Sequence, residues 1–280
     1  MPQETDRDRT DRDPTNVAPT DADPVLVTVD GPVATIRLNR PRQLNVLDIA
    51  MGEGLLAAFT SVSAMAAVRA VVLAGAGRSF MAGGDLTLFH RDPAGAPATA
   101  GRLIDLFHQT MLVIRRMPQP VIAALQGPVA GGGLGLALAC DLGVAAEDAT
   151  FLSAYTKIAT SPDGGTTWSL TRLLGPRRAM EVMLLNEPMD ARTALALGLV
   201  NRVVPPGEVE AEALVIARRI AAGAHGAISA VKRLVGCAVT ADFAEQLAAE
   251  KVSFIERAGS ADFREGIAAF LERRAPGFEP

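Results

Sequence analysis

Short apolar runs alternate with longer amphipathic stretches along most of the chain. The runs at residues 25–29 and 33–38 flank Asp30-Gly31, a strong signal for a β-hairpin. Asp48 is a suitable N-cap for a helix that reaches about residue 65. The remaining predicted strands cover residues 70–74, 120–125, 142–146 and 149–153, and the remaining predicted helices cover residues 101–116, 131–140, 166 onward, 176–185 and 191–197. Alternating strands and helices indicate an α/β fold.

The pattern changes at both ends of the chain. Residues 1–23 contain almost no large apolar side chains, so we expect a disordered tail. Beyond residue 206, four Ala-rich amphipathic stretches predict a helical lobe over residues 206–280, which we expect to take part in oligomerisation. Residues 24–205 then form the core. Within the core, residues 85–100 are rich in Pro, Gly and Ala and are expected to be mobile.

Composition excludes several classes of function. The formal net charge is −4, no basic stripe is present and aromatic residues make up 4% of the chain, so nucleic-acid binding has little support. No apolar run approaches the roughly 18 residues of a membrane span, and the N-terminal residues alternate Asp and Arg, so we expect a cytoplasmic protein with no membrane partner. Cys140 and Cys237 fit apolar helical patterns, and neither His90 nor His225 has neighbours at ligand spacing, so no metal site is predicted.

Two glycine-rich segments each follow an apolar strand. One is Arg78-Ser-Phe-Met-Ala-Gly-Gly-Asp-Leu86, and the other is Gln126-Gly-Pro-Val-Ala-Gly-Gly-Gly-Leu-Gly135, which opens a helix. A phosphate cradle is the weakest interpretation of the second segment, because no Gly-Lys-Ser/Thr ending is present. Close helix packing would explain one segment alone. Two such loops can instead each direct one N–H at a single carbonyl oxygen and so form an oxyanion hole.

The chain resembles the crotonase (enoyl-CoA hydratase/isomerase) superfamily in three motifs. They are N-R-P-x-x-L-N at Asn39 to Asn45, A-G-x-D-L at Ala82 to Leu86, and P-V-I-A-A-L-x-G-x-x-x-G-G-G ending at Gly133. The resemblance covers residue 24 to the C-terminus. It implies a spiral of ββα repeats with a helical C-terminal lobe, an acyl-CoA substrate, and a homotrimer or dimer of trimers. It implies no cofactor beyond the coenzyme A of the thioester.

The resemblance also assigns roles to residues. The N–H groups of Gly84 and Gly132 would hold the thioester oxygen, and Arg40, Ala82, Asp85, Leu86 and Arg273 are candidates for contacting coenzyme A. Hydratases of the family use two glutamates, and the matching positions here are Gly135 and Tyr155. Hydration in the usual manner is therefore doubtful, because a paired acid and base is missing.

Asp163, in Ser161-Pro-Asp-Gly-Gly165, admits two interpretations. The residues around it suit a turn and a helix cap. Family members with Asp at this position use it as the acid/base of double-bond isomerisation, or as a nucleophile towards an aromatic acyl ring. The second chemistry occurs in 4-chlorobenzoyl-CoA dehalogenase, in which a His at the offset of His108 is the base and an aromatic residue occupies the Tyr155 position.

Three functions follow from these residues. The favoured function is isomerisation of an enoyl-CoA with Asp163 as acid/base. The second is dehalogenase-like or hydrolytic chemistry with Asp163 as nucleophile and His108 as base. A lone His on an apolar helix is more often a packed or surface residue than a catalytic one, so His108 decides little by itself. The third is a subunit that binds a CoA ester without converting it.

Overall fold

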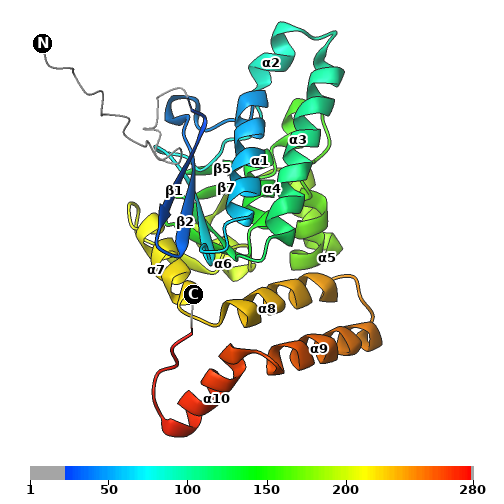
Figure 1. Cartoon of the computed structure of the whole chain (residues 1–280). Helices are drawn as coiled ribbons and strands as arrows, with labels where there is room; N and C mark the ends of the chain where they lie inside the picture. Colours follow the sequence, from blue (N-terminus) through cyan, green and yellow to red (C-terminus); the bar gives the residue numbers. More distant parts are fainter. Residues whose placement is uncertain (1–22, 279–280) are drawn as a thin grey trace, which may run out of the picture.

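Six strands form the larger of two sheets in the computed structural model, which describes residues 23–278 (Figure 1). The strand order is β1-β2-β3-β4-β6-β9, and β1 is the only antiparallel member among the described residues. The predicted hairpin is confirmed, and Gly31 occupies its turn with φ +55°. The bounds are β1 Val25–Asp30, β2 Val33–Leu38, β3 Ala70–Gly75, β4 Val121–Leu125, β6 Leu142–Ala146 and β9 Arg202–Val204.

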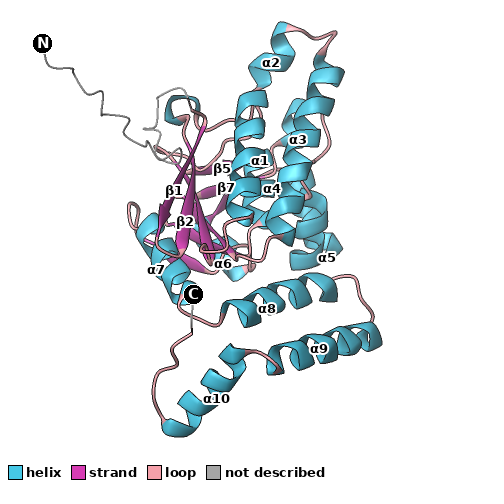
Figure 2. Cartoon of the chain, in the orientation of Figure 1, coloured by secondary structure: helices cyan, strands magenta, loops and turns pink. Residues whose placement is uncertain are grey.

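The smaller sheet has the order β5-β7-β8 (Figure 2). Its strands are β5 Pro128–Ala130, β7 Thr150–Leu152 and β8 Met189–Asp190, and a parallel bridge from Met81 to Val129 extends it. The chain adds β4 to the large sheet and then β5 to the small one, and repeats this with β6 and β7. This is the expected spiral of ββα repeats.

Helices cover the sheets and agree closely with the hydrophobic pattern. Asp48 caps α1 by accepting a hydrogen bond from the Met51 amide at 2.7 Å. The long helix α3 packs against α1, and α5 combines two predicted helices with a bend at Gly175 (φ +74°). The elements are α1 Ile49–Ser63, α3 Ala96–Arg116, α4 Gly132–Ala139, α5 Thr166–Leu185, α6 Ala191–Ala196 and the short 3₁₀ helices η1 Pro41–Gln43 and η2 Tyr155–Ile158.

The segment at residues 85–100 is largely helical, although its Pro, Gly and Ala content predicted no helix there. It contains helix α2, Leu86–Arg91, and the first turn of α3. The Asp85 carboxylate starts α2 by accepting a hydrogen bond from the Thr87 amide at 2.9 Å. Pro97 lies in the first turn of α3, where its missing N–H costs nothing.

The C-terminal helices divide into two groups. Helix α7, Val209–Ala221, buries Val209, Ala213 and Ala217 against the large sheet, so it belongs with the core by its contacts although it lies beyond residue 206. Helices α8 His225–Ala238, α9 Phe243–Ala258 and α10 Ala261–Glu272 extend away from both sheets, and we call them the C-terminal arm (Figure 1).

Residues 1–22, which hold nearly all of the expected disordered tail, lie outside the described residues. In the described part of the chain, no single helix has the length and apolar character of a membrane span. Helices α7 and α8 meet those criteria only as a pair, with a bend of 110° between them.

Candidate active site

The two glycine segments lie against each other. A methyl group at Gly131 would lie 3.5 Å from Gly83 Cα, and one at Gly133 would lie only 2.1 Å from the Met81 carbonyl oxygen. Gly83 and Gly131 both have positive φ, at +107° and +53°. Close approach and left-handed backbone therefore both require glycine here.

The amides of Gly84 and Gly132 make no hydrogen bond within the described residues. Gly84 forms a bridge to Leu47, but the hydrogen bonds of that bridge come from its neighbours, Leu47 N to Gly83 O at 2.8 Å and Asp85 N to Leu47 O at 2.9 Å. Gly132 is the first residue of α4, where an N–H has no acceptor within the helix. Within residues 23–278, neither amide has a hydrogen-bond acceptor.

Asn45 explains the N-R-P-x-x-L-N motif. Its side chain is fully buried, donates to the carbonyls of Ser79 at 2.8 Å and Phe80 at 3.1 Å, and accepts from the Arg40 amide at 2.8 Å. These bonds join the start of the first glycine segment to η1. The motif thus shapes the loop that presents Gly84.

Asp163 does not cap α5. The N-cap of that helix is Gly165, and no side chain caps it. The Asp163 carboxylate instead accepts a hydrogen bond from the Tyr155 hydroxyl, with 2.5 Å between Oη and Oδ1. Burial, followed by the negative charge and hydrogen bond of Asp163, raises the pKa of Tyr155, so this phenol remains a donor. The cap interpretation is wrong for this side chain.

His108 lies beside the Asp163 loop with an exposed side chain. Its Nε2 accepts a hydrogen bond from the Gly164 amide at 3.2 Å. His108 therefore supports the backbone next to Asp163.

Phe107 is a residue that sequence reasoning missed. A methyl group at Gly132 would lie 3.6 Å from its ring, and one at Gly164 would lie 2.6 Å from it. The ring thus separates the start of α4 from the Asp163 loop and sets their spacing. Its only signal in the sequence is an apolar position next to His108.

Gly135 occupies one of the two positions at which hydratases have glutamate. A methyl group there would lie 3.0 Å from Thr166 Oγ1 and 3.1 Å from the Gly164 carbonyl oxygen. A side chain at position 135 would therefore be in tight contact with the Asp163 loop and the start of α5.

The residues expected to contact coenzyme A are only partly brought together. Arg40 pairs with Asp48 at 2.8 Å, Asp85 caps α2, the Ala82 amide donates to Leu44 O at 3.1 Å, and the Leu86 side chain is exposed. Arg273 follows α10 at the opposite end of the molecule from α2 (Figure 1). Within one chain, Arg273 therefore lies far from this group.

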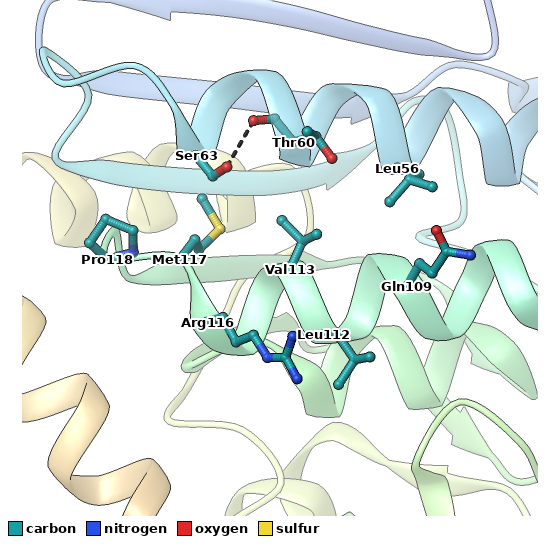
Figure 3. A pocket seen from close by; sticks show the side chains of 9 residues that line it. All are labelled: Leu56, Thr60, Ser63, Gln109, Leu112, Val113, Arg116, Met117 and Pro118. Carbon is teal, nitrogen blue, oxygen red and sulfur yellow. Dashed lines mark hydrogen bonds between the residues drawn. The ribbon is translucent and has the colours of Figure 1, made fainter.

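Two cavities lie outside the glycine segments. One, of about 580 Å³, is a groove in which residues of α1 such as Leu56 and Thr60 face Val113 of α3 (Figure 3). The other, of about 1090 Å³, lies between α3, α5 and the C-terminal arm. Neither is lined by Asp163 or Gly132, and among residues 23–278 no cluster of His, Cys, Asp and Glu is arranged to hold a metal ion.

Comparison with known proteins decides the family. The family model described as Enoyl-CoA hydratase/isomerase matches residues 28–280. The chain belongs to the enoyl-CoA hydratase/isomerase family. The protein is therefore an enzyme of the crotonase superfamily. The crotonase fold that the three motifs imply is confirmed.

Relatives within the family carry both hydratase and isomerase names. A probable enoyl-CoA hydratase of Rhodobacter capsulatus is 38% identical, with 88% of this chain and 94% of the relative covered. The 1,2-epoxyphenylacetyl-CoA isomerase of Escherichia coli is 35% identical, with 91% and 97% covered. The crystal structure of an enoyl-CoA hydratase from Polaromonas sp. JS666 has a TM-score of 0.88 at 35% identity, with 91% of this chain and 99% of that chain covered.

Proposed function

We propose that this enoyl-CoA hydratase/isomerase family enzyme moves a carbon–carbon double bond within an enoyl-CoA, with Asp163 as the single acid/base. The observation that carries the proposal is the Asp163 carboxylate, which accepts a hydrogen bond from Tyr155 at one oxygen. Its other oxygen is left to act on the substrate. Hydratases need a second carboxylate, and positions 135 and 155 hold Gly and Tyr.

In this reaction, Asp163 removes one proton from the substrate and returns it at another carbon. Asp163 removes a proton from the carbon next to the thioester carbonyl of a 3-enoyl-CoA, and the electron pair moves onto the carbonyl oxygen. The amides of Gly84 and Gly132 stabilise that enolate oxygen, and each such donor is worth about 10²–10³ in rate. Asp163 then returns the proton to the fourth carbon as the double bond moves to the second. No atoms are gained or lost, and coenzyme A enters only as part of the substrate.

The packing around Gly135 argues against hydration. Hydration would need a carboxylate at position 135 to activate water. Gly164 and Thr166 lie close to the Gly135 backbone at that position. Restoring a glutamate at position 135 would require the Asp163 loop to move. Hydration therefore lacks a second carboxylate, and a side chain at position 135 would need Gly164 and Thr166 to shift.

The contacts of His108 argue against the nucleophilic alternative. A general base needs a free lone pair, and the Nε2 lone pair of His108 accepts the Gly164 N–H. His108 would have to leave Gly164 before it could activate water to release an ester of Asp163.

Incubation with a 3-enoyl-CoA, followed by liquid chromatography and mass spectrometry, tests the proposal. We expect a 2-enoyl-CoA of unchanged mass, and Asp163→Asn should lower kcat by about 10²–10⁴. Asn keeps an acceptor for Tyr155, so the variant should remain folded and bind the ester. A product heavier by one water, or full turnover by Asp163→Asn, would contradict isomerisation through Asp163.

We also propose that the enzyme assembles as a homotrimer or dimer of trimers through the C-terminal arm. The arm exposes large apolar side chains on all three of its helices, which is typical of a surface covered by another subunit. They include Val231, Val235, Phe243, Phe254, Phe270 and Leu271. Sedimentation equilibrium measures this directly, and a monomer at micromolar concentration would contradict it.

A further inference from the structure

The cavity of about 1090 Å³ between the core and the C-terminal arm is lined by cationic side chains from several elements. Arg115 and Arg116 come from the end of α3, Lys232 and Arg233 from α8, and Arg257 from α9, while Trp168 of α5 forms one wall. Figure 1 shows α8 and α9 lying across the ends of α3 and α5. The volume suits a ligand larger than a single ion, since ligand pockets measure roughly 300–1,000 Å³.

Three of these cations form no salt bridge with a carboxylate of the described residues. Lys232 pairs with Asp141 at 2.8 Å, and Arg257 pairs with its neighbour Glu256. In contrast, no carboxylate among residues 23–278 pairs with Arg115, Arg116 or Arg233. The cavity therefore has a positive charge that the protein itself leaves unbalanced.

Two of the arginines that line the cavity, Arg115 and Arg233, are held in place. The Arg115 guanidinium carbon lies 4.6 Å from the centre of the Trp168 ring, and that of Arg172 lies 4.1 Å from it. Arg233 donates to Ser253 Oγ at 3.2 Å. A stacked guanidinium keeps its N–H donors in its own plane, free for an anion. Arg116 lines this cavity and also the groove between α1 and α3 (Figure 3).

We propose that this cavity binds a small molecule carrying two or more linked phosphate groups. Each guanidinium group can donate two parallel hydrogen bonds to an anion. A ligand with several phosphate groups offers enough oxygens for several guanidinium groups, whereas a ligand with a single carboxylate does not. The shared chemistry has two sources, the phosphates of coenzyme A and those of a free nucleotide. Trp168 lies in the first turn of α5, close behind Asp163, so a bound anion would touch the helix that follows the catalytic loop.

Trp168 is the single tryptophan of the chain and reports on this cavity. We expect its fluorescence to change saturably on titration of the full chain with inorganic pyrophosphate, relative to sodium chloride at equal ionic strength. Arg116→Gln and Arg233→Gln should each weaken pyrophosphate binding about tenfold or more. Arg177→Gln is the matched control, since Arg177 is exposed on the same helix as Trp168 but does not line the cavity.

Circular dichroism would verify that each variant is folded. Titrations with ADP and with coenzyme A then distinguish the sources. Equal affinity for pyrophosphate and ADP indicates a free nucleotide, and tighter binding of coenzyme A indicates the substrate's own phosphates. The absence of a saturable response to pyrophosphate, or equal affinity in wild type and both cavity variants, would overturn the proposal. Isomerase activity is not needed for any of these readouts, so they stand apart from the proposed reaction.

Discussion

Helices α4 and α8 of this enzyme differ in how much of their surface is buried. Every residue of α4, from Gly132 to Ala139, is buried in the core. In α8, all of which is described, no residue is buried, and Val235 keeps 63% of its surface exposed. Helix α4 is apolar throughout and α8 is amphipathic, so an apolar face in the sequence indicates that a partner is needed but not which one. In the core the apolar face packs against the same chain, whereas in the arm the described residues leave much of it exposed.

The joint between core and arm gives the largest expected change in stability. The Lys232 ammonium is buried, pairs with Asp141, and donates to the carbonyls of Ile114 at 2.8 Å and Gln119 at 2.9 Å. Lys232→Met should lower the free energy of unfolding by about 2–3 kcal/mol, because Asp141 and two carbonyls lose their partner. Urea denaturation measures it.

The matched control for this joint is Lys251→Met, since Lys251 is exposed on α9. It should leave stability nearly unchanged. Equal effects of the two substitutions would mean that Lys232 does not fasten the arm to the core.

Within the core, the substitution Tyr155→Phe should affect kcat. Tyr155→Phe removes one hydrogen bond to the Asp163 carboxylate, and we expect kcat to fall about tenfold with little change in KM. Steady-state kinetics on a 3-enoyl-CoA measures this. Unchanged kcat would show that Tyr155 only packs beside Asp163.

Tyr155 also predicts a dependence on pH. Its pKa is raised in the folded chain, so the folded state holds the phenol proton after the unfolded state has released it near pH 10. This contribution to stability is fully present below about pH 10 and is lost as pH rises further. Tyr155 is the single tyrosine, so ultraviolet titration should show no tyrosinate until the chain unfolds. Ionisation near pH 10 in the folded enzyme would contradict the buried hydrogen bond.

His108 should matter less than Asp163. We expect His108→Ala to lower kcat by less than about tenfold, because only one hydrogen bond to the Gly164 amide is lost. The same kinetic assay applies. A loss above about 10² would instead indicate a general base and favour the nucleophilic alternative.

The arm should tolerate polar substitutions within one chain. Phe270 is 82% exposed, so Phe270→Ser should change the unfolding free energy of an isolated chain by no more than about 0.5 kcal/mol. The same variant should weaken self-association, as sedimentation velocity would show. Unaltered association would place the subunit interface elsewhere.

Local patterns in the sequence determined most of the fold. The hairpin at Asp30-Gly31, the cap at Asp48 and the helices of the arm follow from alternation, capping and periodicity, which act within a few residues. The strands β5, β8 and β9 were not predicted, because runs of two or three residues carry no periodicity. The first turn of α3 was missed because Pro and Gly dominate residues 92–97.

The sequence also indicated the two glycine segments, Asp163 and the absence of the hydratase glutamates. Only the tertiary structure decided what these residues do to one another. The Asp163 carboxylate accepts from Tyr155 and not from the helix start, His108 accepts from Gly164, and Phe107 separates α4 from the Asp163 loop. These contacts join residues far apart in the chain, and their geometry depends on how whole elements pack. A single sequence carries no local signal for such pairs, because the residues around each partner give no information about the distant residue it contacts.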